Sequence, residues 1–265
     1  MISSVAVKKT ASTAIKQNAT AGILAGAAFV LVCTIGVLLL SIISSVSGIA
    51  GAIFAFAFIM FVCYPTFLGA LRFFRRMIWG ECDSLVSVFY YFSSRNAYKS
   101  AITLSGALAI RLAGGFLALN IPAFAVSAAA SHKFYELLNL PTPVWTSYVW
   151  PILAFLRCSA AILLFIYLLK FYMAPFLFVS TDKTAEECIL LSCRVSRRSA
   201  SDFFWLLVSM FGWIIISVFL IPLIFTLPYF IAAYIVHCRF AVAQYNKTVD
   251  SMKVAPPTFN ADESI

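Results

Sequence analysis

The sequence predicts an all-α polytopic membrane protein with six transmembrane helices, cytoplasmic termini and two amphipathic cytoplasmic loop helices. Of its 265 residues, 63% are hydrophobic and only 11% are charged, whereas a soluble domain carries about 25% charged residues. Sixteen of the nineteen Lys and Arg residues lie in every second gap between long apolar segments. The composition therefore predicts that lipid surrounds the chain. The alternation of the basic residues predicts how the chain is oriented in the membrane.

Six segments reach the length of about 20 mostly apolar residues that crosses the hydrocarbon core of a bilayer. Each is expected to be a helix, because unpaired backbone groups in lipid cost several kcal/mol apiece. The predicted spans cover residues 21–43, 48–71, 101–126, 149–172, 203–224 and 226–245. They leave a basic N-terminal segment, 1–20, and a polar tail, 246–265, which we expect to be disordered.

The basic residues predict which side of the membrane each gap faces. Positive residues stay on the cytoplasmic side, and the outer gaps hold only Lys133. Both termini are therefore expected inside, with a basic patch on the same side. The patch comprises Arg72, Arg75, Arg76, Arg95, Arg194, Arg197 and Arg198. Anionic lipid headgroups are its expected partner, and nucleic acid is not expected, because the chain has no basic soluble module.

Two cytoplasmic loops are predicted to form short amphipathic helices. In the first, Asp83 is expected to cap a helix whose apolar positions are Leu85, Val88, Phe89 and Phe92. In the second, Thr184 and Glu187 form a capping-box pattern ahead of a helix through Arg198. Its apolar positions include Cys188, Leu191 and Val195. Each helix either lies on an anionic membrane surface or packs under the bundle as a connector.

Three polar residues inside the predicted spans are candidates for binding an anionic headgroup or solute. Arg111 lies near mid-bilayer in the third span, Asn120 lies late in that span, and Arg157 lies in the outer part of the fourth. A membrane-embedded Arg costs at least ~2.5–3.5 kcal/mol, so it suggests a function. Two such residues can grip an anion between them. The alternative is that backbone carbonyls, Asn120 or hydroxyl groups of neighbouring helices satisfy each arginine.

Other functional classes find little support in the sequence. All ten acidic residues lie outside the predicted spans, which disfavours a proton- or sodium-coupled carrier with a membrane carboxylate. His237, in the sixth predicted span, is expected to be a hydrogen-bonded helix contact. We predict no catalytic residue, no metal ligand and no cofactor, because no such constellation of residues is present.

Short motifs over most of the chain carry a resemblance to a known family. They are Lys8-Lys9, Ala14-Ile15-Lys16-Gln17-Asn18, Gly69-Ala70-Leu71-Arg72-Phe73-Phe74, Trp79-Gly80-Glu81, Met173-Ala174-Pro175-Phe176, Glu187 with Ser192, Phe211-Gly212-Trp213 and Pro228-Tyr229. In these motifs the chain resembles the bacterial integral membrane family called domain of unknown function 975. The resemblance implies a multi-pass bacterial membrane protein with no established reaction or substrate. The chain departs from it at Ser196 and Arg198, where the family usually has Met and a helix-stopping Gly.

These features lead to two functional hypotheses. The first is a non-enzymatic bacterial inner-membrane protein that organises lipid, or that serves as an accessory subunit of a membrane-protein partner or a homo-oligomer. The second is a permease-like protein for an anionic or lipid-like solute held by Arg111 and Arg157. A cavity joining the two arginines favours the second hypothesis, and a closed bundle with buried, carbonyl-bonded arginines favours the first.

Overall fold

The computed structural model describes residues 4–81, 84–130, 149–216 and 220–254, and every regular element in those ranges is helical. Five helical segments in this part are long and apolar enough to cross a membrane. They are Ala19–Val46, Gly48–Ile78, Arg95–Ala129, Val149–Leu168 and Pro222–Val249. The chain therefore has the character of a membrane protein, and these segments match five of the six predicted spans. The fifth predicted span, 203–224, is not among them.

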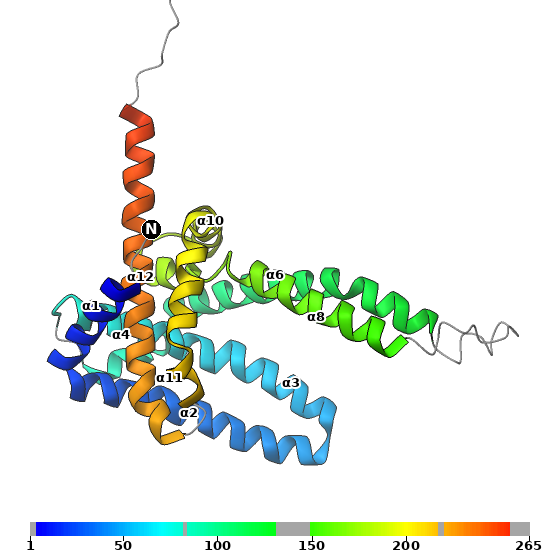
Figure 1. The fold of residues 1–265 in the computed structure, drawn as a ribbon. Coiled ribbons are helices and arrows are strands. Elements are labelled where there is room, and N and C mark those ends of the chain that lie inside the picture. Colours follow the sequence, from blue (N-terminus) through cyan, green and yellow to red (C-terminus); the bar gives the residue numbers. More distant parts are fainter. Residues whose placement is uncertain (1–3, 82–83, 131–148, 217–219, 255–265) are drawn as a thin grey trace, which may run out of the picture.

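Two helical hairpins extend in the same direction from one end of the molecule (Figure 1). The elements of the first are α2 (Ala19–Val46), α3 (Gly48–Phe58), η1 (Ile59–Cys63) and α4 (Tyr64–Ile78). The elements of the second are α6 (Arg95–Ala129) and α8 (Val149–Leu168). Ser47 forms the tip of the first hairpin, where its hydroxyl accepts the Ala50 N–H and so begins α3.

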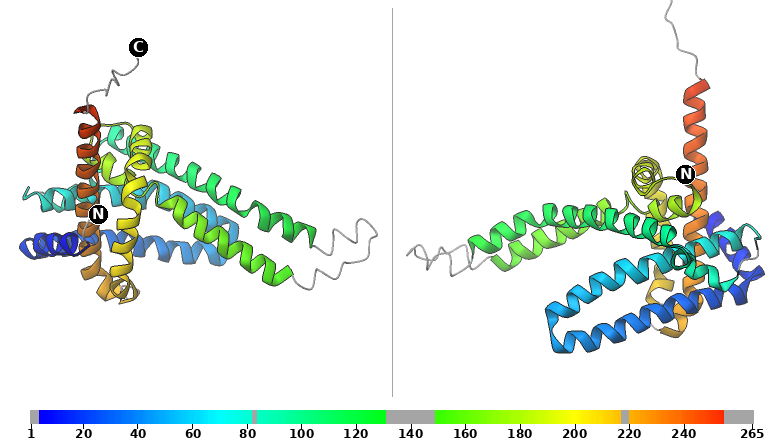
Figure 2. Two further views of the ribbon diagram at one scale, coloured as in Figure 1. Left: turned by 45° about the horizontal axis from the view of Figure 1, so that its top comes forward. Right: turned by 180° about the vertical axis from the view of Figure 1, so that it is seen from behind.

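α12 (Leu220–Val254) runs across the two hairpins near their shared end (Figures 1 and 2). Half of the residues in the apolar 18-residue stretch of this span are buried inside the protein, whereas 11–22% are buried in the corresponding stretches of the other four candidate spans. The hairpins thus leave most of their apolar surface for lipid. Six spans and cytoplasmic termini remain predictions.

α2 and α12 meet at a notch formed by Gly22 and Gly26, which face Pro228 of α12. A Cβ atom at Gly26 would lie 3.0 Å from Pro228 Cγ, and one at Gly22 would lie 3.8 Å from Pro228 Cβ. Small residues four positions apart allow membrane helices to approach this closely. The contact also accommodates a proline in the interior of α12, where it offers no N–H to the Ile224 carbonyl.

The region of the fifth predicted span is divided between three helices. α10 (Ala185–Ser209) continues past Arg198, where the loop helix was expected to end, because no Gly or Pro follows to stop it. The chain then passes through Met210 into α11 (Phe211–Ile216). Because α12 begins at Leu220, the predicted break at residue 225 between the fifth and sixth spans lies inside that helix, which corrects the predicted position of the break.

The first of the two loops predicted to be cytoplasmic forms η2 (Leu85–Phe89) and a single turn, α5 (Tyr90–Ser93). Val88 is fully buried. The other apolar positions of the predicted helix are 39–43% exposed: Leu85, Phe89 and Phe92. The expected cap, Asp83, lies outside the described residues. This loop is therefore held at Val88 and presents its remaining apolar side chains outward, as a helix at a membrane surface does.

Two roles were expected for the second loop helix, and α10 has that of a connector that packs against other helices. Thr184 Oγ1 accepts the Glu187 N–H at 3.4 Å, and the Glu187 carboxylate accepts the Thr184 N–H at 3.0 Å, which confirms the predicted capping box. The buried positions that follow include Cys188, Ile189 and Val195. Since these apolar residues pack inside the protein, they are not a face laid on lipid.

The capping box predicts a pH dependence in the acidic range. Its hydrogen bonds from the Thr184 backbone N–H and side chain lower the pKa of Glu187 from the ordinary value of 4.5. Because the pKa is depressed in the folded state, the stabilisation is present above 4.5 and is lost as the pH falls through the folded pKa. We expect Glu187→Gln to reduce the loss of stability on acidification, measured by thermal unfolding in detergent. An equal acid sensitivity in both proteins would contradict this.

The described residues nearest the two ends of the chain are helical, although hydropathy and charge did not predict helices there. α1 (Ser4–Gln17) packs against α12 with Val7 and Ala11 fully buried. At the other end α12 continues to Val254, well into the tail predicted to be disordered from residue 246. This corrects the prediction for that part of the tail, because no helix breaker occurs there before Pro256. Residues 255–265 lie outside the described part.

Candidate anion-binding site

Two of the predicted intramembrane residues bond to their own helix. Arg111 is half-buried, and its Nη1 donates to the Ala107 carbonyl at 3.4 Å. Asn120 Nδ2 donates to the Phe116 carbonyl at 2.9 Å. Each side chain therefore satisfies a carbonyl one turn earlier in α6, as the alternative to a ligand site expects.

The helix pairing keeps Arg157 away from Arg111. Tyr167 of α8 donates its hydroxyl hydrogen to the Arg111 carbonyl oxygen at 3.4 Å, which sets the two residues at one level of the hairpin. Arg157 comes ten residues before Tyr167 on α8, or about 15 Å along the helix. Its side chain is exposed. The structure thus does not bring the two arginines together around one small anion.

The seven arginines of the predicted basic patch fall into separate groups. Arg72, Arg75 and Arg76 lie together in the last turns of α4. Arg95 is exposed at the start of α6. The other three, Arg194, Arg197 and Arg198, are exposed along α10. Only the α4 group is fixed by several contacts to other elements, so it is the best candidate site.

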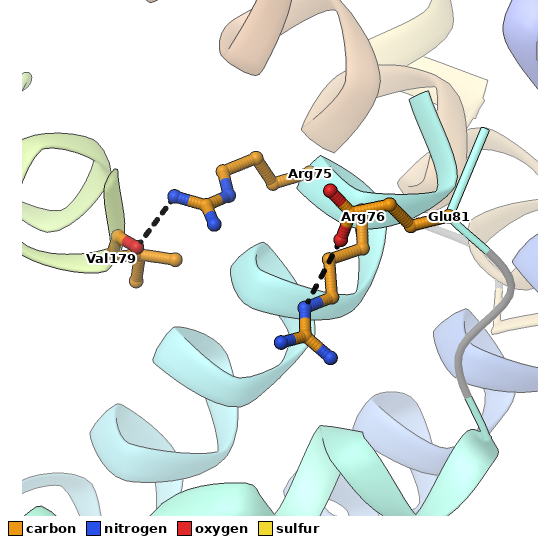
Figure 3. A network of polar contacts seen from close by, with 4 residues as sticks. All are labelled: Arg75, Arg76, Glu81 and Val179. Atoms are coloured by element: carbon orange, nitrogen blue, oxygen red, sulfur yellow. Dashed lines mark hydrogen bonds and ion pairs between the residues drawn. The ribbon is translucent and has the colours of Figure 1, made fainter. Parts of the chain in front are cut away.

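A pocket of about 250 Å³ lies at the end of α4 beside α9 (Ala174–Ser180). We call it the basic pocket; it is lined by Arg75, Arg76, Trp79, Glu81, Phe176 and Ser180. Arg75 Nη1 donates to the Val179 carbonyl oxygen of α9 at 2.8 Å (Figure 3). Arg76 instead turns toward Glu81, with 3.5 Å between Nε and Oε2 (Figure 3).

The local sequence explains how Glu81 reaches the basic pocket. Gly80 has φ of 78°, a left-handed conformation that glycine adopts without strain. The Glu81 N–H then donates to the Arg76 carbonyl at 3.0 Å and the Gly80 N–H to the Met77 carbonyl at 3.2 Å. This is the glycine-terminated end that many helices share. The Trp79-Gly80-Glu81 motif thereby folds the acidic side chain back over α4.

Further aromatic contacts hold the surrounding cations in place. The Arg72 guanidinium lies 3.5 Å from the Tyr90 ring centroid, and that of Arg239 lies 4.9 Å from the Trp79 ring centroid. Burial raises the pKa of the neighbouring Tyr91 to about 12, although Arg72 acts in the opposite direction. That phenol therefore stays neutral. Among the described residues that line the basic pocket, Glu81 is the one carboxylate and two are arginines.

The basic pocket also contains an unused hydroxyl group. Ser180 Oγ is buried and has no hydrogen-bond partner among the described residues. An Arg guanidinium carries five N–H donors in a fork that matches carboxylate and phosphate oxygens. Arg75 therefore carries N–H donors beyond the one that binds the Val179 carbonyl, and it lines the pocket together with Arg76 and Ser180. The arrangement fits an anion with several oxygens, for which Glu81 is an internal competitor.

His237 belongs to a different polar cluster. Tyr172 Oη lies 2.8 Å from Ser199 Oγ and 3.1 Å from His237 Nε2. Ser199 and His237 are both buried. This confirms His237 as a hydrogen-bonded helix contact. Sequence reasoning missed Tyr172 and Ser199, because nothing in the sequence indicates that these distant positions meet.

The chain matches no protein-family model, no curated protein and no solved structure. Its resemblance to the family of unknown function remains a prediction. The functional argument therefore rests on the geometry of the basic pocket.

Proposed function

We propose that this chain is a non-enzymatic membrane protein that binds anionic lipid headgroups in the basic pocket and so organises lipid around itself. The single observation that carries the proposal is that Arg75, Arg76 and Ser180 line one pocket, and that the Ser180 hydroxyl has no partner among the residues the structure describes. The positive-inside pattern puts this end at the cytoplasmic face, and the family resemblance favours a bacterial inner membrane.

Lipid phosphate suits the basic pocket on both charge and position. The last turn of a helix favours cations, so α4 holds its arginines without a matching number of carboxylates. The cytoplasmic leaflet is rich in anionic lipid, and a cytoplasmic cluster of Lys and Arg attracts it. The exposed apolar residues of the first loop, Leu85, Phe89 and Phe92, offer lipid an apolar surface on elements that pack against α4.

The permease-like alternative finds no comparable support. It depends on Arg111 and Arg157 holding one solute, and about 15 Å of helix separates their levels. Neither residue lines the basic pocket.

The double variant Arg75→Gln/Arg76→Gln tests the proposal directly. A hydrogen bond to a charged group contributes about 1.5–3 kcal/mol, so we expect phosphatidylglycerol to bind roughly tenfold more weakly or worse. Phosphatidylcholine binding is expected to change little. The measurement is native mass spectrometry of the protein in mild detergent, with thermal unfolding to confirm that the variant folds.

The matched control is Arg194→Gln/Arg197→Gln, which removes the same charge from the exposed face of α10. Glu81→Gln is expected to strengthen phosphatidylglycerol binding, because it removes the competing carboxylate. Equal losses in both double variants would mean that net charge alone attracts the lipid and would refute the pocket. A copurifying protein, with no bound lipid that depends on Arg75 and Arg76, would instead indicate an accessory subunit.

A further inference from the structure

A second cavity, of about 410 Å³, lies between α4, α9, α10 and α12. Its walls are almost entirely apolar and include Phe67, Pro175, Leu206, Leu207, Leu227 and Ile231. We call it the apolar cavity. Its volume falls within the range of about 300–1,000 Å³ that is typical of ligand sites. Leu207 and Leu227 are only half-buried, so the cavity reaches the surface of the protein.

The two tyrosines that line the apolar cavity offer little to a polar ligand. The Tyr172 hydroxyl is engaged with Ser199 and His237, at 2.8 and 3.1 Å. The Tyr234 hydroxyl donates to the Tyr172 carbonyl at 2.6 Å. A buried water needs two to four polar partners, and apolar cavities without them stay dry. Hydrocarbon is therefore the occupant that matches these walls.

The apolar cavity lies within reach of the basic pocket. α9 contributes Pro175 to the cavity and Ser180 to the pocket. On α4, Phe67 lines the apolar cavity and Arg75 lines the basic pocket. These two residues lie about 12 Å apart along the helix. The headgroup layer of one leaflet is roughly 5–8 Å thick. The acyl chains of a lipid whose phosphate occupies the basic pocket therefore begin close enough to reach the apolar cavity.

We propose that the apolar cavity holds one acyl chain of the anionic lipid whose headgroup occupies the basic pocket, an inference that rests on the proposed function. The headgroup pocket then selects the lipid, and the cavity withdraws one of its chains from the bilayer. In a membrane the chain gains little from leaving other hydrocarbon. Selectivity accordingly comes from the phosphate contacts and from the shape of the cavity.

The test uses the full-length protein in phosphatidylcholine vesicles with a phosphatidylglycerol that carries a photoactivatable diazirine on one acyl chain. We expect adducts in residues 203–210 and 227–234, and a loss of about tenfold or more in the cavity-filling variant Leu207→Trp. Val208→Trp is the matched control, because Val208 is 45% exposed on the same helix. Leu227→Phe supplies a second filled cavity if the first variant does not fold.

Two further arms separate this proposal from the headgroup proposal. Arg75→Gln/Arg76→Gln is expected to reduce the adducts to the level given by a diazirine phosphatidylcholine. Adducts spread over exposed apolar faces and unchanged by Leu207→Trp would overturn the chain site, and headgroup binding would stand if native mass spectrometry still showed it. Adducts sensitive to Leu207→Trp but indifferent to both arginines would refute the link between the two sites.

Discussion

Replacing Gly69 with alanine is expected to destabilise the protein by about 2–3 kcal/mol, the upper part of the range for overpacked sites. Gly69 of α4 faces the backbone of the loop that carries η2. A Cβ atom there would collide with the Val88 carbonyl oxygen and lie 2.7 Å from the carbonyl carbon. Because the obstacle is backbone, no rotamer change relieves the clash. The loop must move away, which exposes the fully buried Val88.

The measurement is the free energy of unfolding in mixed detergent micelles, with Gly106→Ala as the matched control. Gly106 also lies in a candidate span, and nothing lies within 4 Å of a Cβ atom there. Alanine at Gly106 is expected to be neutral or to stabilise α6 by up to about 1 kcal/mol. Val88→Ala is not expected to rescue Gly69→Ala, because the clashing carbonyl remains. Rescue would show that the side chain, and not the backbone, sets the distance.

Gly69 illustrates what the sequence alone does not disclose. Apolar length and charge are local properties, so they indicated α2, α6 and α8 close to their actual extents. The cap of α6 is also local, since Ser94 Oγ accepts the Ala97 N–H. The contact of Gly69 with Val88 depends on how a loop returns to its helix, and hydropathy carries no information about that path.

The fifth predicted span shows the limit of hydropathy in another way. Averaged hydropathy treats residues 203–224 as one segment, although these residues contact different parts of the protein. Leu206 is buried against other helices, whereas Trp205 is 57% exposed. The helix ends at Ser209, and its cap residue Met210 has φ of −103° and ψ of 1°. Gly212 lies two residues beyond the cap, and an average of hydropathy gives such a position no weight.

The candidate site was predictable in kind but not in composition. The charge pattern indicated that Arg75 and Arg76 belong to a basic surface. It did not indicate that Arg75 reaches Val179, a residue 104 positions away in the chain. Ser180 and Arg239 were missed for the same reason. Arg111 attracted attention because a membrane arginine is costly, and its bond to Ala107 needs only its own helix.

The notch between α2 and α12 leads to the second large effect: Gly26→Leu is expected to destabilise the protein by about 3 kcal/mol or more. Pro228 Cγ and Cδ would lie 3.0 and 3.2 Å from a Cβ atom at Gly26, and the Ile224 carbonyl oxygen 3.4 Å. A leucine side chain therefore has no room unless the helices separate. Because α12 is the most buried of the candidate spans and packs on both α2 and α4, their separation loosens the first hairpin.

Gly114→Leu is the control, since a Cβ atom there meets nothing within 4 Å. Gly26→Ala is expected to cause a smaller loss, because the proline ring must yield by only a few tenths of an ångström.

A double-mutant cycle tests whether the proline is the contact that matters. Pro228→Ala removes the ring and returns an N–H for the Ile224 carbonyl, so Gly26→Ala should cost less in that background. Residues in direct contact couple by about 0.5–3 kcal/mol. A coupling free energy near zero would mean that Gly26 is needed for the bend or flexibility of α2, and not for its approach to α12.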